Sequence, residues 1–338
     1  MGQAPIQIGW IPYWNLLPLQ HELSRLSGRS IKLLAGHPTA VNRWLSDGTV
    51  QLAPASSIAL LKSRNLEMAL PLGIASDGPV LSVYLGLQRH HECFLNFVTA
   101  RQRLLNARFH DAVGRFGFDL RQTARLIWSA TRAERPEGMM PALRLTPASA
   151  ASAALTRLLM NLWIGESQAT QMMAQATTVQ GGHEVAASED QPIELVIGDE
   201  ALQRRHEFWR VLDLGQVWQE LTGLPFVFGL WQTSSKILPP QLRQILAEAG
   251  SIAQARMRVE PQVFFPENPI YSGDGNPVDL AAYWKVIQYR LGERHLKSLL
   301  LYFSLYLEIC GRPDHDLAAE RFVRWSQVWN QPGGIGVN

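Results

Sequence analysis

The stretch IQIGWIPYWNLLP (Ile6–Pro18) places a strand pattern, a loop and a helix start in immediate succession. Residues 6–10 alternate between apolar and other side chains as a strand does, and Pro12 ends the regular structure. Asn15 therefore stands on a loop at the carboxyl end of the first strand. Helix patterns over 16–26 and 38–47, and a strand pattern over 30–35, follow directly. This order predicts an α/β fold.

The alternation of strands and helices continues along the chain. Further strands are expected over 51–55, 68–74, 80–87, 142–145, 193–197 and 225–231. Helices are expected over 58–64, 153–164, from 201, over 217–221 and through most of 239–329. Such an order favours a mostly parallel sheet whose ligand sites lie beyond the carboxyl ends of the strands.

Length and composition limit the class of protein. A chain of 338 residues exceeds what one core supports comfortably, so we expect two lobes, each with its own core. The net charge is +2 without a block of Lys and Arg, which argues against nucleic acid or an anionic membrane as partner. No secretory-signal pattern and no membrane-spanning apolar run occur, and Cys93 and Cys310 lie far apart. These features predict a cytoplasmic protein with reduced thiols.

Motifs for the common cofactors and nucleophiles are missing from the sequence. There is no Gly-rich phosphate loop, no GxGxxG after a strand, no GxSxG and no HExxH. His90, His91 and Cys93 match no standard metal-binding spacing. We therefore expect neither a cofactor nor a metal.

Three loops carry polar groups suited to a small anion. Asn15 has both a donor and an acceptor and can hold a hydroxyl or a carboxylate, although the alternative is that it merely caps the following helix. Ser149 and Ser152 flank a helix start, where free N–H groups favour an anion, and the alternative is an ordinary cap. Ser56 and Ser57 follow a strand in the same manner, either as a second anion site or as a capping pair.

Several separated motifs together resemble those of the chorismate dehydratases, enzymes of the futalosine route to menaquinone. The motifs are Ile11–Pro18, Ala53–Ile58, Ile74–Val83, Ser149–Ser152, Ile197–Leu202, Asp213–Gly215 and Thr222–Phe228. They cover most of the chain outside about 89–141, a helical stretch that we interpret as an atypical insertion. Ala151 departs from the family pattern, which usually has Thr there.

The resemblance implies a two-lobed type II periplasmic-binding-protein-like fold with a ligand cleft between the lobes. Lobe 1 would be discontinuous, combining residues 1–86 with 232–338 and its C-terminal helices. Lobe 2 would span 87–231 and include the insertion. Strands near 80–87 and 225–231 would lead the chain out and back.

The activity implied is that of a carbon–oxygen lyase that removes water from chorismate, without a cofactor. Asn15 and Ser82 would be catalytic, and the substrate's own enolpyruvyl carboxylate would serve as base. Substrate binding would involve Ser56, Ser57, Ser149, the Ala151 amide, Ser152 and Asp199, the last bracing the cleft wall. The alternatives are a non-catalytic small-anion binding protein of the same fold and a diverged homologue acting on a related carboxylate. The sequence leaves a homodimer open.

Overall fold

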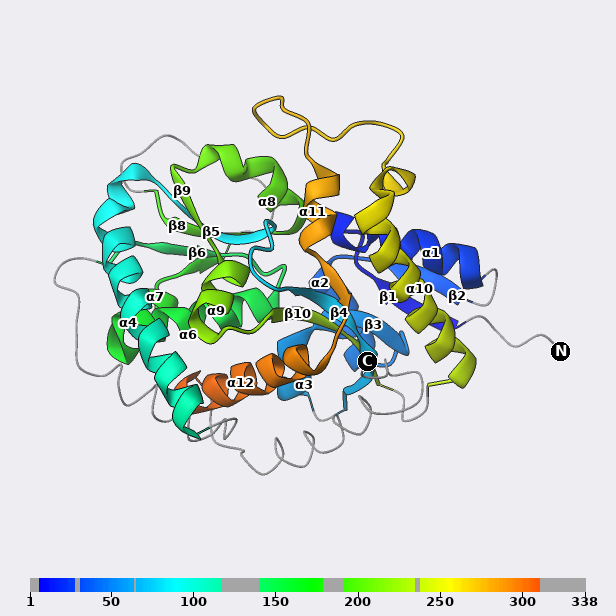
Figure 1. The fold of residues 1–338 in the computed structure, drawn as a ribbon, viewed down its shortest axis with the longest axis horizontal. Helices are drawn as coiled ribbons and strands as arrows, with labels where there is room; N and C mark the ends of the chain where they lie inside the picture. The colour runs from blue at the N-terminus through cyan, green and yellow to red at the C-terminus, as the bar shows by residue number, and fades with distance from the viewer. Residues whose placement is uncertain are drawn as a thin grey trace.

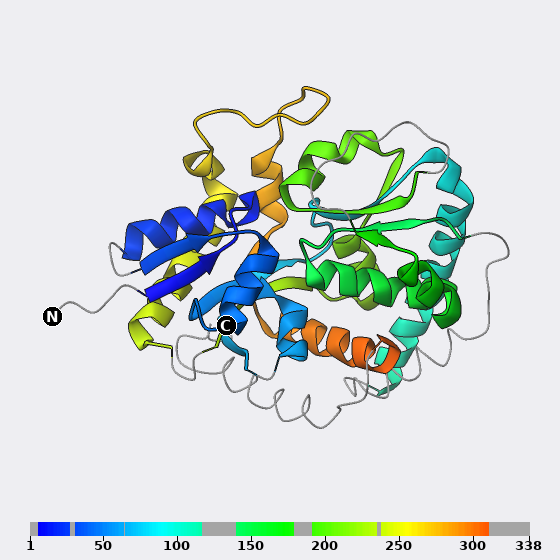
Figure 2. The same ribbon diagram turned by 180° about the vertical axis from the view of Figure 1, so that it is seen from behind.

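The computed structural model describes residues 6–27, 31–63, 65–116, 140–178, 191–234 and 238–310. Its elements form two β-sheets that lie side by side, each flanked by helices (Figure 1). The first sheet has the order β11-β4-β10-β3-β1-β2 and the second β7-β6-β8-β5-β9. The view from behind again shows the two sheets side by side with helices around them (Figure 2).

The strands of the first sheet are β1 (Ile6–Trp10), β2 (Ile31–Ala35), β3 (Leu52–Ser56), β4 (Glu67–Ser76), β10 (Phe226–Thr233) and β11 (Gln288–Arg290). Those of the second are β5 (Val83–Leu87), β6 (Leu143–Leu145), β7 (Thr177–Thr178), β8 (Ile193–Ile197) and β9 (Arg210–Asp213).

The helices that precede β8 in the chain are η1 (Trp14–Leu16), α1 (Leu17–Ser27), α2 (Pro38–Ser46), α3 (Ser57–Lys62), η2 (Arg89–His91), α4 (Glu92–Phe116), α6 (Ala150–Ile164) and α7 (Glu166–Ala174). Those that follow are α8 (Gly198–Arg204), η3 (Arg205–Glu207), α9 (Leu214–Thr222), α10 (Pro240–Val259), η4 (Pro261–Phe264), α11 (Leu280–Val286) and α12 (Glu293–Cys310). The helix and strand patterns of the sequence are thus largely confirmed, with bounds shifted by a few residues.

Both sheets are mixed, so the expectation of a mostly parallel sheet was wrong. Strand β1 pairs in parallel with β2 and β3, but β10 is antiparallel to both β3 and β4. In the second sheet β5 is antiparallel to β8 and β9. Strands β5 and β10 are those by which the chain enters one sheet from the other. Parallel neighbours in a sheet are joined by a crossover, usually a helix, that returns the chain to the same end of the sheet. Neither β5 nor β10 is preceded by such a crossover within its own sheet, and both run antiparallel to their neighbours.

The crossing points between the sheets differ from the predicted lobe boundaries at 86 and 232. All of β5 pairs within the second sheet and all of β10 within the first. The chain therefore crosses between Ser76 and Val83, and again between Thr222 and Phe226. Residues 83–86 and 226–231 lie on the opposite side from the one that the sequence-based division gave them. We propose a division into lobes at these two crossings.

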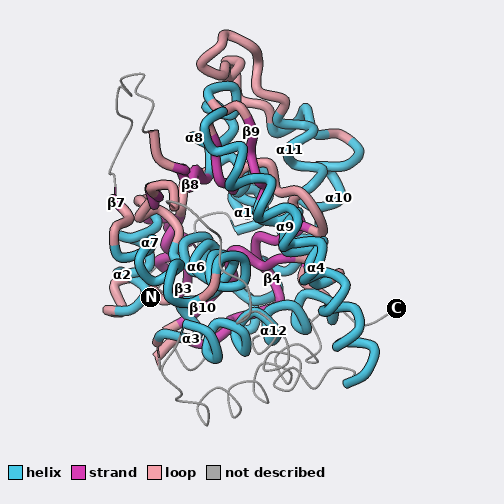
Figure 3. Tube along the Cα trace, turned by 90° about the vertical axis from the view of Figure 1, so that its left-hand side faces the viewer, coloured by secondary structure: helices cyan, strands magenta, loops and turns pink. Residues whose placement is uncertain are grey.

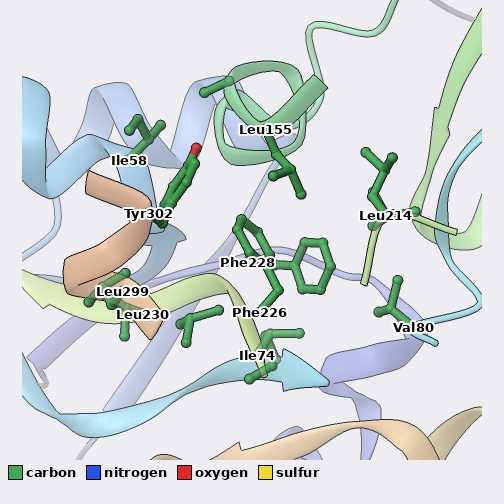
Figure 4. Packing of buried hydrophobic residues seen from close by; sticks show 14 of the residues in the cluster. Ile58, Ile74, Val80, Leu155, Leu214, Phe226, Phe228, Leu230, Leu299 and Tyr302 are labelled. Atoms are coloured by element: carbon green, nitrogen blue, oxygen red, sulfur yellow. The ribbon is translucent and has the colours of Figure 1, made fainter. Parts of the chain in front are cut away.

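Most of the hydrophobic core of the described residues is one cluster that includes residues of both sheets, whereas separate cores were expected. A small second cluster consists of Tyr84, Val196 and Ala201. At the centre of the larger cluster Phe226 contacts Phe228 and Tyr302, with ring centroids 4.7 and 5.0 Å apart (Figure 4). Aromatic pairs of this kind contribute roughly 0.5–1.5 kcal/mol each beyond the area they bury. Helix α12 packs against α6, α3 and β10, so a C-terminal helix closes the junction between the two halves.

The predicted insertion begins as expected with a helix. Helix α4 runs for 25 residues and packs beside α9 (Figure 3). Of the remaining part of the insertion, residues 117–139 lie outside the described residues. Among the described residues no helix combines the length and apolar character needed to cross a membrane.

Candidate functional site

The loop that carries Asn15 is held from behind by aromatic side chains of the C-terminal part of the chain. The indole N–H of Trp284 donates to the carbonyl oxygen of Trp14 at 2.8 Å. The phenol of Tyr289 donates to the carbonyl oxygen of Asn15 at 2.5 Å. These bonds occupy the backbone of the loop and leave the amide group of Asn15 on the side of the cleft. Two residues some 270 positions away thus fix its position.

Ser82 follows a strained residue at the crossing between the sheets. Leu81 has φ +66°, a left-handed conformation that costs a non-glycine residue about 1–3 kcal/mol. The buried carboxylate of Asp213 accepts the N–H groups of Val80 and Leu81, the latter at 2.7 Å, and so holds this conformation. The phenol of Tyr283 donates to the Ser82 Oγ at 2.9 Å. The Ser82 side chain is therefore placed by contacts from two separate segments.

The start of α6 supplies hydrogen-bond donors on the side of the cleft formed by the second sheet. Ser149 is the N-cap, and its Oγ accepts the N–H of Ser152 at 3.2 Å and lies 2.9 Å from the Ser152 Oγ. First-turn N–H groups have no partner within a helix, and the positive end of the helix dipole points outward there. Both hydroxyls line the cleft, so this end of α6 is suited to an anionic ligand.

The junction of β3 and α3 supplies two serine hydroxyls on the first sheet's side. Within the described part of the chain, the Oγ atoms of Ser56 and Ser57 are buried without a hydrogen-bond partner. The amide of Gln232 donates to the carbonyl oxygens of Ala55 and Ser56 and holds the end of β3 in place. Because an unpaired buried hydroxyl is costly, the Ser56 hydroxyl is well placed to pair with a ligand.

These elements surround a cleft that is partly open to solvent, with about 700 Å³ of empty space when the adjoining open solvent is included. Five of the eight residues singled out from the sequence line it together, namely Asn15, Ser56, Ser82, Ser149 and Ser152. Three do not line it: Ser57, Ala151 and Asp199. The methyl group of Ala151 is fully buried, and its carbonyl oxygen accepts a hydrogen bond from Tyr302 at 3.2 Å.

Two polar residues of the cleft escaped the sequence analysis. Tyr13 lines it, and burial raises the pKa of its phenol to about 12, so it stays protonated at neutral pH. Asn42, on α2, also lines it with a buried Oδ1 that has no hydrogen-bond partner in the described part of the chain. No local sequence signal separated Asn42 from an ordinary exposed helix residue.

Asp199 ties the two sides of the cleft together. Its carboxylate accepts the backbone N–H of Trp14 at 2.9 Å, although the two residues belong to α8 and η1 on opposite sides. Beside it Gly198 has φ +66°, and a Cβ there would lie 3.1 Å from the ring of Tyr13. Burial raises the pKa of Asp199 to about 7 because only one N–H compensates for the lost hydration. The contact fits the role of a brace.

The cleft-lining residues of the described chain bring hydroxyls, amides and apolar surface, with Tyr13 as their one titratable side chain. Among the described residues no group of three or more His, Cys, Asp or Glu is placed to hold a metal ion. The arrangement can therefore bind and orient a small polar ligand through neutral donors and a helix N-terminus. It offers no strong base of its own.

Two sheets joined by a pair of crossings, with a cleft between them, define the two-lobed type II periplasmic-binding-protein-like fold. The comparison with solved structures agrees. A protein from Bordetella bronchiseptica RB50 aligns at TM-score 0.54 and 10% identity over 97% of this chain and 99% of its own. The alkanesulfonate-binding protein SsuA from Xanthomonas axonopodis pv. citri, solved with MOPS, aligns at TM-score 0.50 and 14% identity over 95% and 98%.

The chain belongs to the menaquinone-biosynthesis family. The family model with that description matches residues 6–93 and 121–308, which include all of the cleft-lining residues. No curated protein matches the sequence. The family pattern is interrupted over 94–120, within the predicted insertion, and resumes at 121 rather than after 141.

Proposed function

We propose that the protein is a chorismate dehydratase, a carbon–oxygen lyase that converts chorismate into 3-[(1-carboxyvinyl)oxy]benzoate and water. The observation that carries the proposal is the meeting of Asn15 and Ser82 in one cleft with the donors at the start of α6. Membership of the menaquinone-biosynthesis family supports it. The proposal places the reaction in the cytoplasm, on the futalosine route to menaquinone, in keeping with the two free cysteines.

Chorismate has two carboxylates and one ring hydroxyl, and the cleft has three matching groups of polar atoms. Ser149 and Ser152 at the start of α6 suit one carboxylate, and the unpaired Ser56 hydroxyl on the opposite wall suits the other. Asn15 and Ser82 lie in the same cleft and are left for the ring hydroxyl. Closure around the substrate excludes water and strengthens these neutral hydrogen bonds.

The elimination removes a proton from the ring carbon that bears the enolpyruvyl ether and the hydroxyl from its neighbour. The electrons of the C–H bond become the new ring double bond, and the C–O electrons leave with oxygen. Because Tyr13 is the sole titratable lining group among the described residues and stays protonated, the substrate's enolpyruvyl carboxylate is the base in this proposal. That carboxylic acid returns the proton to the departing hydroxide, so aromatisation and loss of water require positioning more than acid–base groups.

Replacing Asn15 by Asp tests this mechanism. The introduced carboxylate would repel the substrate's carboxylates and could no longer donate to the ring hydroxyl, so we expect kcat to fall by about 100-fold or more, the loss typical of a key hydrogen-bond donor. Asn42→Asp is the matched control, because it places the same charge in the same cleft away from the proposed reacting group. There we expect mainly a higher KM. A fully active Asn15→Asp enzyme would refute the assignment.

A non-catalytic anion-binding protein is the second candidate. The fold is shared with the alkanesulfonate-binding protein, and a helix N-terminus facing a cleft suits binding without turnover. In that case chorismate or a related carboxylate would bind and be recovered unchanged. A diverged enzyme, for which Ala151 is the main sequence argument, would instead convert a related carboxylate. A homodimer stays a prediction, tested by the mass of the protein in solution.

A further inference from the structure

We propose that Tyr283 is a positioning residue that directs the Ser82 hydroxyl into the cleft as a hydrogen-bond donor. The inference rests on the proposed function for its kinetic test. Tyr283 does not line the cleft and lies behind Ser82, so it acts through that residue and not on the substrate.

The geometry of the contact assigns the donor and the acceptor. Tyr283 is on α11, is 1% exposed, and its phenol donates to the Ser82 Oγ at 2.9 Å. The Asn15 side chain lowers the pKa of the same phenol, an effect smaller than that of burial. Burial raises the pKa of Tyr283 above its ordinary value, so the phenol is protonated at neutral pH.

A serine hydroxyl has one hydrogen and two acceptor lone pairs. Because the phenol donates to one lone pair of Ser82, the Ser82 hydrogen points away from Tyr283, and Ser82 lines the cleft. A donor aimed at the departing hydroxyl weakens its C–O bond. The proton taken from the ring carbon still completes the water, so neither Ser82 nor Tyr283 gains or loses a proton over the reaction.

The first test is a double-variant cycle on chorismate turnover with Tyr283→Phe, Ser82→Ala and both together. We expect Tyr283→Phe to lower kcat about tenfold with KM changed less than about twofold. In the Ser82→Ala background the same change should have no further effect, because the phenol acts through the serine. Tyr84→Phe is the control: it removes an equally buried phenol whose 2.9 Å bond, to the Ala201 carbonyl, lies elsewhere. It should leave kcat unchanged.

Effects that multiply in the double variant, or a Tyr283→Phe enzyme with full kcat, would overturn the inference. If the wild type does not convert chorismate at all, the proposed function fails, and the cycle is then run on the urea midpoint of the ligand-free protein. There the destabilisation by Tyr283→Phe should largely disappear in the Ser82→Ala background. Additive shifts of the midpoint would overturn the positioning role independently of any activity.

Discussion

Removing the Asp213 carboxylate should destabilise the protein far more than removing an ordinary helix cap. Its oxygens accept four backbone N–H groups: those of Gly215 and Gln216 at the start of α9 and those of Val80 and Leu81 at the crossing between the sheets. Loss of a cap costs about 1 kcal/mol, and each buried N–H left unpaired costs about 1–3 kcal/mol. Because Leu81 is only half-buried and water can reach it, we expect Asp213→Ala to lower the free energy of unfolding by about 3–5 kcal/mol.

Urea unfolding followed by tryptophan fluorescence measures this loss, and Asp279→Ala is the matched control. Asp279 caps α11 through a single exposed bond to the Ala282 N–H at 2.9 Å, so its loss should cost about 1 kcal/mol. Proteins are stabilised by roughly 5–15 kcal/mol in total, so the difference between the two variants is easily measured. If Asp213→Ala shifted the midpoint no more than Asp279→Ala, Asp213 would be a plain cap, and the reasoning that it holds the crossing would be refuted.

Two further predictions concern the walls of the cleft. Burial raises the pKa of Asp199 to about 7, so between about pH 4 and 7 the folded protein holds a proton that the unfolded chain has released, and Asp199 makes stability fall as pH rises. Asp199→Asn removes this titration. The difference in urea midpoint, variant minus wild type, should therefore be larger at about pH 7.5 than at about pH 4.5. The same difference at both pH values would contradict the raised pKa. Ser149→Ala should lower the free energy of unfolding by about 1 kcal/mol through the lost cap. It should also raise KM for chorismate several-fold with little change in kcat, and an unchanged KM would remove Ser149 from the binding site.

The sequence predicted the elements that have a clear local pattern and missed one that depends on pairing with a distant strand. The alternation over 6–10 and the apolar run over 193–197 coincide with β1 and β8. Both patterns depend only on how the strand's own side chains are buried, so the local sequence is enough to predict them. By contrast β11 (Gln288–Arg290) was not predicted, because it lies within a segment expected to be largely helical. Among the described residues β11 pairs only with β4, more than 200 positions earlier, and the local sequence pattern does not reveal so distant a partner.

The site was predicted to the level of loops but not of individual side chains. Ser56 and Ser152 line the cleft while their neighbours Ser57 and Ala151 do not, since adjacent residues at a helix start point in different directions. Which of each pair faces the ligand depends on how the helix is rotated against its sheet. Asn42 reaches the cleft only because α2 packs beside β1, a tertiary fact that its surrounding sequence does not reveal.

The most direct test of the central claim is incubation of the purified protein, freed of metal, with chorismate. Ultraviolet absorbance reports the aromatic ring, and mass spectrometry reports the loss of one water. We expect 3-[(1-carboxyvinyl)oxy]benzoate to accumulate at a rate proportional to the amount of protein, and about 100-fold or more slowly with Asn15→Asp. Chorismate recovered unchanged, whether bound in the cleft or not, would contradict it.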